Sequence, residues 1–85
     1  MSGQNEGQWG LHEARAWERA RLGEAGIDSV DADTRELLEW ACNASSQWEL
    51  PTALTQRQSE ALRSGVRERS LRIPLQHVTG RMFFR

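Results

Sequence analysis

Three stretches of this sequence place apolar residues at helical spacing, and this periodicity restricts the fold more than any other feature. In each stretch, apolar residues recur three or four positions apart among mostly polar and charged ones, as in a helix that buries one face. A chain of 85 residues forms one domain at most and has little room for a deep cleft. The sequence therefore predicts an all-α fold: a small helical bundle of three longer helices plus one or two short turns.

The first predicted helix runs from about Gln8 to Glu24. Its apolar face has a gap, which either Trp17 or Glu18 fills. The other residues of this face are Leu11, Ala14, Leu22 and Ala25. Gly26 follows directly, at the position where glycine commonly ends a helix.

The second predicted helix runs from about Val30 to Ala44. Candidate N-cap residues are Asp28, Ser29 and Asp31. Asp31 and Asp33 lie in its first turn, where negative charge suits the positive end of the helix dipole. Its predicted buried face consists of Leu37, Leu38, Ala41 and Cys42. Asn43 belongs to the group of polar residues that ends this helix.

The third predicted helix has the clearest start. The Thr55 hydroxyl can accept from the Gln58 backbone N–H while the Gln58 side chain reaches back to Thr55, which is a capping box. Its apolar face consists of Ala61, Leu62 and Val66. Gly65 would allow a neighbouring helix to approach closely. Because Pro74 disfavours helical geometry in the residue before it, the helix should end near Leu71.

The residues after this proline predict one more helical turn, over 75–78, which Gly80 ends. Met82 to Phe84 then predict an extended apolar end that leads to a linker hairpin missing from this chain. The predicted organisation is a flexible N-terminal tail over residues 1–10, a helical domain over 11–80 and the start of a linker over 81–85.

The sequence contains no pattern typical of metal or nucleotide binding. His12, Cys42 and His77 share no ligand spacing, and the seven glycines form no phosphate-binding loop. Glu36 and Glu39 lie one helical turn apart, which is better explained as a solvated helix face than as a catalytic pair. We therefore predict no catalytic, cofactor-binding or metal-binding residue within these 85 residues.

The single cysteine and the lack of long apolar runs indicate a cytoplasmic location. Cys42 cannot form a disulfide within the chain and is predicted to be a small core residue. No apolar run approaches the ~20 residues needed to cross a bilayer. Residues 1–10 lack the basic and then apolar order of a signal peptide.

Four tryptophans are many for a chain of this length. Trp17 and Trp40 are predicted to wedge between helices as part of the core. For Trp9 and Trp48, the sequence leaves two roles open: packing in the core or contact with a partner, because tryptophan is also enriched at interface hot spots. Trp48 also falls in a predicted single helical turn before Pro51.

Charge is distributed unevenly along the chain. Residues 1–50 contain ten acidic residues and four arginines, a net charge of −6, whereas residues 51–85 contain seven arginines and two glutamates, a net charge of +5. The arginines of the third helix could contact nucleic-acid phosphates. No aromatic residue is interleaved with them, however, and the whole chain has a net charge of −1. We therefore favour a solvated face or a face for an acidic protein surface.

The C-terminal third of the chain resembles a known family. The segment PLQHVTG at residues 74–80, followed by Phe84, is similar to the segment that closes the N-terminal domain of the HemK/PrmC family, the glutamine methyltransferases of peptide release factors. Earlier segments resemble family motifs in the same order. They are LGEAGIDS at residues 22–29, Asp33 with LLE at residues 37–39, and LT at residues 54–55 with Arg69. The resemblance spans roughly residues 11–85.

This resemblance implies a helical domain joined through a β-hairpin linker to a Rossmann-like domain that binds S-adenosylmethionine. That second domain carries an Asn-Pro-Pro-Tyr motif for the substrate, the Gln of the release factor's Gly-Gly-Gln tripeptide. Neither that motif nor a glycine-rich cofactor loop occurs in these 85 residues. The resemblance thus implies a release-factor-recognition domain of a protein-(glutamine-N5) methyltransferase that acts in translation termination. The chain alone would be inactive, and the catalytic domain and its cofactor would lie beyond residues 81–85.

The resemblance also suggests residues for contact with a partner or with the catalytic domain. They are Arg69, Pro74, Leu75, His77, Gly80 and Phe84. The expected partners are the peptide chain release factor as protein substrate and the chain's own catalytic domain in cis, with neither a membrane nor a nucleic acid favoured. For His77, a packing or capping role within the domain is the simpler alternative.

Two other functions stay open from the residues alone. The chain could be a helical protein–protein module without an enzymatic role, such as a dimerisation bundle. It could also be a nucleic-acid-binding module, whose affinity would fall steeply with salt.

Overall fold

The computed structural model describes residues 9–80, which form a small all-α bundle, so the predicted fold class is confirmed. The helices are α1 (Leu11–Glu24), α2 (Val30–Cys42), the 3-10 turn η2 (Gln47–Glu49), α3 (Gln56–Ser70) and α4 (Leu75–Thr79). Two short strands, β1 (Trp9–Gly10) and β2 (Ala53–Leu54), pair antiparallel. The linker start at 81–85 and residues 1–8 of the tail lie outside the described residues.

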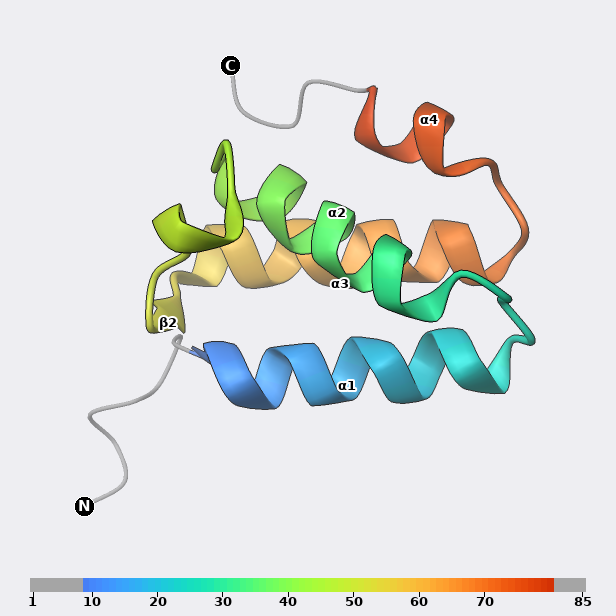
Figure 1. Cartoon of the computed structure of the whole chain (residues 1–85), viewed down its shortest axis with the longest axis horizontal. Coiled ribbons are helices and arrows are strands. Elements are labelled where there is room, and N and C mark those ends of the chain that lie inside the picture. The colour runs from blue at the N-terminus through green and yellow to red at the C-terminus, as the bar shows by residue number, and fades with distance from the viewer. Residues whose placement is uncertain (1–8, 81–85) are drawn as a thin grey trace.

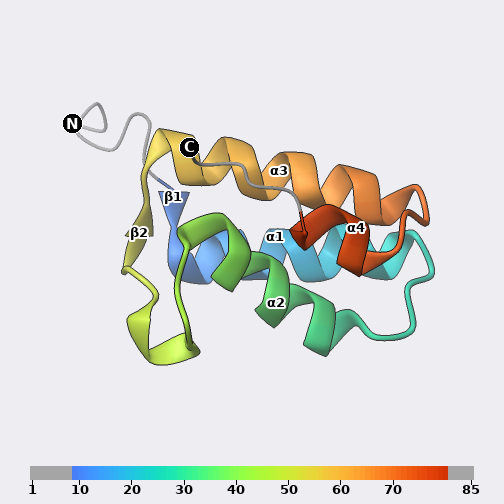
Figure 2. The ribbon, with the colours of Figure 1, turned by 90° about the horizontal axis from the view of Figure 1, so that it is seen from above.

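The three long helices pack against one another around a single core. α1 and α3 run in the same direction, and α2 runs back against both (Figure 1). α4 packs on α2 and α3 at the side of the bundle away from α1, as Figures 1 and 2 together show. None of the helices within residues 9–80 has the length and hydropathy needed to span a bilayer.

The core contains most of the apolar residues that the helical periodicity selects, whereas Leu11, Ala25 and Cys42 are only partly buried. The buried apolar residues are Ala14, Leu22, Ile27, Leu37, Leu38, Ala41, Leu54, Ala61, Leu62, Val66 and Val78. The gap in the apolar face of α1 is filled by Glu18, which is fully buried, whereas Trp17 is half-buried at the edge of the core. Trp40 and Cys42 also pack against the core and are half-buried. Trp48, within η2, is 95% exposed.

The ends of α1 and α2 follow from local backbone geometry. Gly26 adopts a φ of 78°, and the following Ile27 N–H donates to the Leu22 carbonyl, which closes the end of α1. α2 ends at Cys42, before the predicted Ala44, because Asn43 adopts a left-handed φ of 55°. At the start of α2, Ser29 occupies the N-cap position, but its hydroxyl donates to Asp33 rather than capping the helix.

α3 confirms the predicted capping box. The Thr55 hydroxyl accepts from the Gln58 N–H at 3.1 Å, and the Gln58 side chain accepts from the Thr55 N–H at 2.9 Å. Gly65 lies where α3 meets α2 and α4: a Cβ there would lie 2.7 Å from the Trp40 ring and 3.3 Å from Val78. The predicted close approach of a neighbouring helix is therefore present.

The N-terminal end of the domain differs from the prediction. Trp9 pairs with Leu54 and Gly10 with Ala53, so both residues belong to the folded domain rather than to a tail. The Leu11 N–H donates to the Thr52 carbonyl at 2.8 Å. Because this segment is held extended against β2, α1 starts at Leu11 rather than near Gln8.

Candidate functional site: the surfaces around α3

The short helix α4 and its two capping residues include four of the six residues that the family resemblance suggested for partner contact. Pro74 is its N-cap residue, with φ −55° and ψ 140°, as expected before a helix that a proline introduces. Val78 is fully buried and anchors α4 on the core. The Thr79 hydroxyl donates to the Leu75 carbonyl at 3.1 Å. α4 is thus anchored on α2 and α3 through Val78, with its other side turned to solvent.

The exposed side of α4 presents Pro74 and His77, while Leu75 is half-buried. Gly80 ends the helix, and a Cβ there would lie 2.6 Å from the Gln76 carbonyl oxygen, so a larger residue would displace the backbone. Phe84 lies outside the described residues. Four of the six candidates therefore lie together at this end of the bundle.

Arg69 points inward instead. Its Nε donates to Asp33 Oδ2 at 2.7 Å, and its Nη1 donates to the Ile73 carbonyl at 3.3 Å. The two side chains are only 19% and 4% exposed. Arg69 thereby connects the start of α2, the end of α3 and the loop that leads to α4. In this structure it positions the candidate surface and is not itself a prominent part of it.

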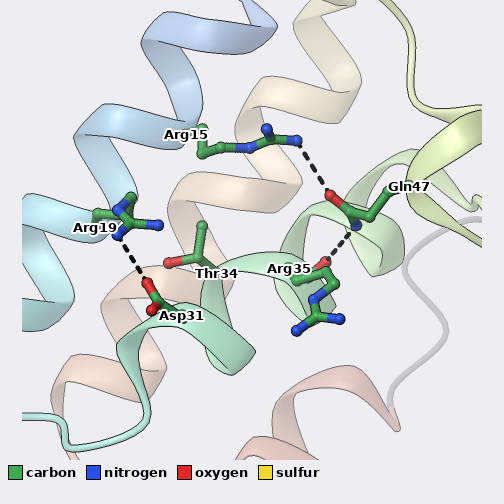
Figure 3. A pocket seen from close by; sticks show the side chains of 6 residues that line it. All are labelled: Arg15, Arg19, Asp31, Thr34, Arg35 and Gln47. Carbon is green, nitrogen blue, oxygen red and sulfur yellow. Dashed lines mark hydrogen bonds and ion pairs between the residues drawn. The ribbon is translucent and has the colours of Figure 1, made fainter.

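A polar cavity of about 210 Å³ lies between α1 and α2 beside η2. Its lining consists of Arg15, Arg19, Asp31, Thr34, Arg35 and Gln47. Figure 3 shows how these side chains engage one another: Arg15 donates to the Gln47 side chain at 3.1 Å, and Arg19 pairs with Asp31 at 2.8 Å. Two of its three arginines therefore already have partners within the chain.

A larger groove of about 330 Å³ lies between α1 and α3, on the other side of α3 from α4. It is lined by Trp17, Arg21, Arg63, Val66, Arg67, Ser70 and Leu71. This groove was not predicted from the sequence, because no aromatic residue is interleaved with the arginines of the third helix. The fold supplies them from α1 and β1: Arg63 lies 4.5 Å from the centre of the Trp9 ring, and Arg21 lies 5.7 Å from that of Trp17. The available signal was the i, i+4 spacing of Trp17 with Arg21 and of Arg63 with Arg67.

One buried acid lies between α1 and α2. Burial raises the pKa of Glu18 to about 9, and the neighbouring Arg15 offsets this only in part. Burial, and secondarily the Glu18 carboxylate, raises the pKa of the Cys42 thiol to about 11. Cys42 is therefore a thiol with little nucleophilic character near neutral pH.

Neither cavity is suited to a cationic cofactor, because each is lined by three arginines. Within residues 9–80, no three His, Cys, Asp or Glu side chains gather closely enough to hold a metal ion. The groove between α1 and α3 offers cationic hydrogen-bond donors next to aromatic and aliphatic side chains, which suits binding to an acidic macromolecule.

A comparison with known families gives one match. Residues 13–80 match the family described as the PrmC N-terminal domain. Searches of curated proteins and of solved structures found no match to the chain.

Proposed function

The chain belongs to the family of PrmC N-terminal domains, and from this we propose that it is the release-factor-recognition domain of a protein-(glutamine-N5) methyltransferase. In this proposal, the enzyme methylates the Gln of the Gly-Gly-Gln tripeptide in a peptide chain release factor. The present domain binds a different surface of the folded substrate and carries no reacting group.

The family match carries the proposal, because residues 13–80 include all of α2, α3 and α4 and most of α1. The surface chemistry supports it. The groove between α1 and α3 is lined by three arginines, and arginine forms bidentate hydrogen bonds with the carboxylates of a protein partner.

A separate recognition domain has a physical advantage in this reaction. A glutamine amide is a weak nucleophile, so rate acceleration depends on holding it in line with the methyl donor. Binding energy from a remote surface of the substrate can provide that orientation. It also favours the intended glutamine over other exposed glutamines.

The proposed cofactor, S-adenosylmethionine, carries a cationic sulfonium group, which the arginine-rich linings of the two cavities described above do not favour. We place the cofactor and the transfer step in the catalytic domain, in cis, outside residues 9–80. The chain would then leave this domain through α4 and Gly80. The hydrogen bond from Arg69 to the Ile73 carbonyl holds the segment before α4, so it would help to fix the position of the catalytic domain relative to this bundle.

A deletion tests the proposal. The complete methyltransferase and a form that lacks residues 1–80 are compared on two substrates, the folded release factor and a short Gly-Gly-Gln peptide. We expect the deletion to lower kcat/KM on the folded release factor by about tenfold or more, because remote binding energy is lost. Activity on the peptide should stay nearly unchanged, which also controls for folding of the catalytic domain. Equal loss on both substrates, or no loss on the folded one, would contradict a recognition role.

A further inference from the structure

The groove between α1 and α3 combines three cations with an apolar floor. Arg21 comes from α1, and Arg63 and Arg67 come from successive turns of α3. No acidic residue is among the residues that line it. The cavity between α1 and α2 differs, because Asp31 lies in its lining and pairs with Arg19.

Among residues 9–80, no ion pair forms with the three guanidinium groups of the groove. Within the described residues, the ion pairs involve Arg19 and Arg69, and none involves Arg21, Arg63 or Arg67. Arg63 and Arg21 are instead held against the Trp9 and Trp17 rings, which themselves meet edge to face at 5.2 Å between centroids. A cation–π contact of this kind holds a guanidinium group near the ring without using its N–H groups as hydrogen-bond donors.

The apolar part of the groove is also available to a partner. Leu71, just past the end of α3, is 68% exposed and lies beside Trp17 and Val66 in the lining. An exposed leucine flanked by aromatic and cationic side chains resembles the mixed apolar and arginine-rich composition of protein interfaces.

We propose that this groove docks an acidic segment of the folded protein substrate, with carboxylates on Arg21, Arg63 and Arg67 and one apolar side chain over Leu71 and Trp17. The proposal rests on the proposed function and assigns the release-factor contact to a surface other than α4. Charge complementarity argues for this occupant: the groove gathers three arginines that have no ion-pair partner among residues 9–80, which suits a partner of opposite charge.

A nucleic acid is the less suitable occupant. The chain as a whole has a net charge of −1, so it lacks the long-range positive field that draws in a polyanion. The arginines also lie within one short groove rather than along a basic track. A short protein segment with a few carboxylates matches the length and the charge of this groove better than a nucleic acid does.

The test measures binding of the 85-residue chain to the folded release factor by calorimetry, at low and at high ionic strength. Arg63→Glu and Arg67→Glu should each weaken binding by roughly tenfold, and wild-type binding should weaken as salt rises. Arg35→Glu is the matched control, since it makes the same charge change at an exposed arginine of α2 and should alter Kd by less than about twofold. Leu71→Ser should weaken binding several-fold without changing its salt dependence.

Each variant is first checked for folding by its thermal unfolding. If a glutamate variant unfolds, Arg67→Gln takes its place, with a smaller expected loss of binding.

If the wild type binds and Arg67→Glu behaves like Arg35→Glu, the groove assignment is overturned while the proposed function stands. If the wild type does not bind the release factor at all, both are overturned. A single-stranded RNA oligomer that competes with the release factor in a manner dependent on Arg67 would assign the groove to nucleic acid and overturn the proposal.

Discussion

Among residues 9–80, Asp33 and Glu18 are the acidic residues buried in the bundle, and only Asp33 has hydrogen-bond partners. Asp33 on α2 accepts from Arg69 at 2.7 Å and from the Ser29 hydroxyl at 3.0 Å. Glu18 on α1 is fully buried, and neither of its carboxylate oxygens has a hydrogen-bond partner within the described residues. The first carboxylate joins two helices through directional contacts, whereas the second occupies an apolar interface as a neutral acid near pH 7.

The contrast shows that the two halves of the bundle are stabilised differently. The α2–α3–α4 half is held by the Asp33–Arg69 pair and by the close packing at Gly65. The α1–α2 interface instead has a buried acid at its centre, and its ion pair, Arg19 with Asp31, lies at the surface. The stability of the α2–α3–α4 half should depend on the Asp33–Arg69 ion pair and on close packing. The stability of the α1–α2 interface should depend on pH.

The largest expected effect comes from breaking the Asp33 pair. Arg69→Ala should lower the free energy of unfolding by about 3 kcal/mol, because it leaves a buried carboxylate without its cation. The Ser29 hydroxyl still donates to Asp33 in this variant. The decrease in the free energy of unfolding should therefore be at the low end of the range for broken buried ion pairs. Chemical denaturation at neutral pH measures the change.

Arg67→Ala is the control for this experiment, because Arg67 lies on the same helix with its side chain exposed. It should change the free energy of unfolding by no more than about 0.5 kcal/mol. Equal losses for Arg67→Ala and Arg69→Ala would mean that the buried pair contributes no more than an exposed arginine does.

The second effect concerns Glu18 and depends on pH. Between pH 4.5 and about 9, the folded state keeps a proton on Glu18 that the unfolded chain releases, so raising the pH favours unfolding. This contribution to stability is complete below pH 4.5 and is lost as the pH rises to about 9. Its slope is at most ~1.4 kcal/mol per pH unit.

Glu18→Leu should remove this slope and raise the free energy of unfolding at pH 8 by about 2 kcal/mol, since no buried acid must then stay protonated. Denaturation series at pH 6.5 and 8.5 compare the variant with the wild type, and Glu24→Leu, at an exposed position of α1, serves as control. Parallel slopes in wild type and variant would show that Glu18 titrates normally in the folded state.

The smallest expected effect is on Cys42. The ionised Glu18 contributes to the raised thiol pKa of about 11, although burial is the larger cause. Glu18→Gln should therefore lower the pKa of Cys42 by less than about 1 unit and leave it above 9.0, the unperturbed value. The pH dependence of alkylation by iodoacetamide measures this pKa, and urea-unfolded chain gives the reference rate. A thiol pKa that rises in the variant would contradict the proximity of the two groups.

Much of the fold could be predicted because its signals are local. The capping box at Thr55, the glycine after α1 and the proline before α4 each act within one helical turn, so their residues are neighbours in the sequence. The β1–β2 pair could not be predicted in this way. Trp9 and Leu54 are brought together only when α1 and α3 pack side by side, and two-residue strands leave no alternation to detect.

The candidate surface was predicted only in part. Pro74, His77 and Gly80, which the family resemblance suggested, are exposed and lie together at one end of the bundle. Arg69 was grouped with them, but its inward direction depends on Asp33, which lies on another helix. The groove at Arg63 and Arg67 was not found, because its aromatic residues come from the opposite end of the sequence.

By itself, the sequence determined which segments become helices, where α3 begins, and most of the apolar face of each long helix. These properties follow from periodicity and capping within a few residues. Only the tertiary structure decided that Glu18 lies in the interior without a partner, that Asp33 meets Arg69, and that two tryptophans lie against the arginines of a surface groove. The reason is physical: burial and charge pairing depend on which helix faces meet, and that is set by the packing of all three helices together.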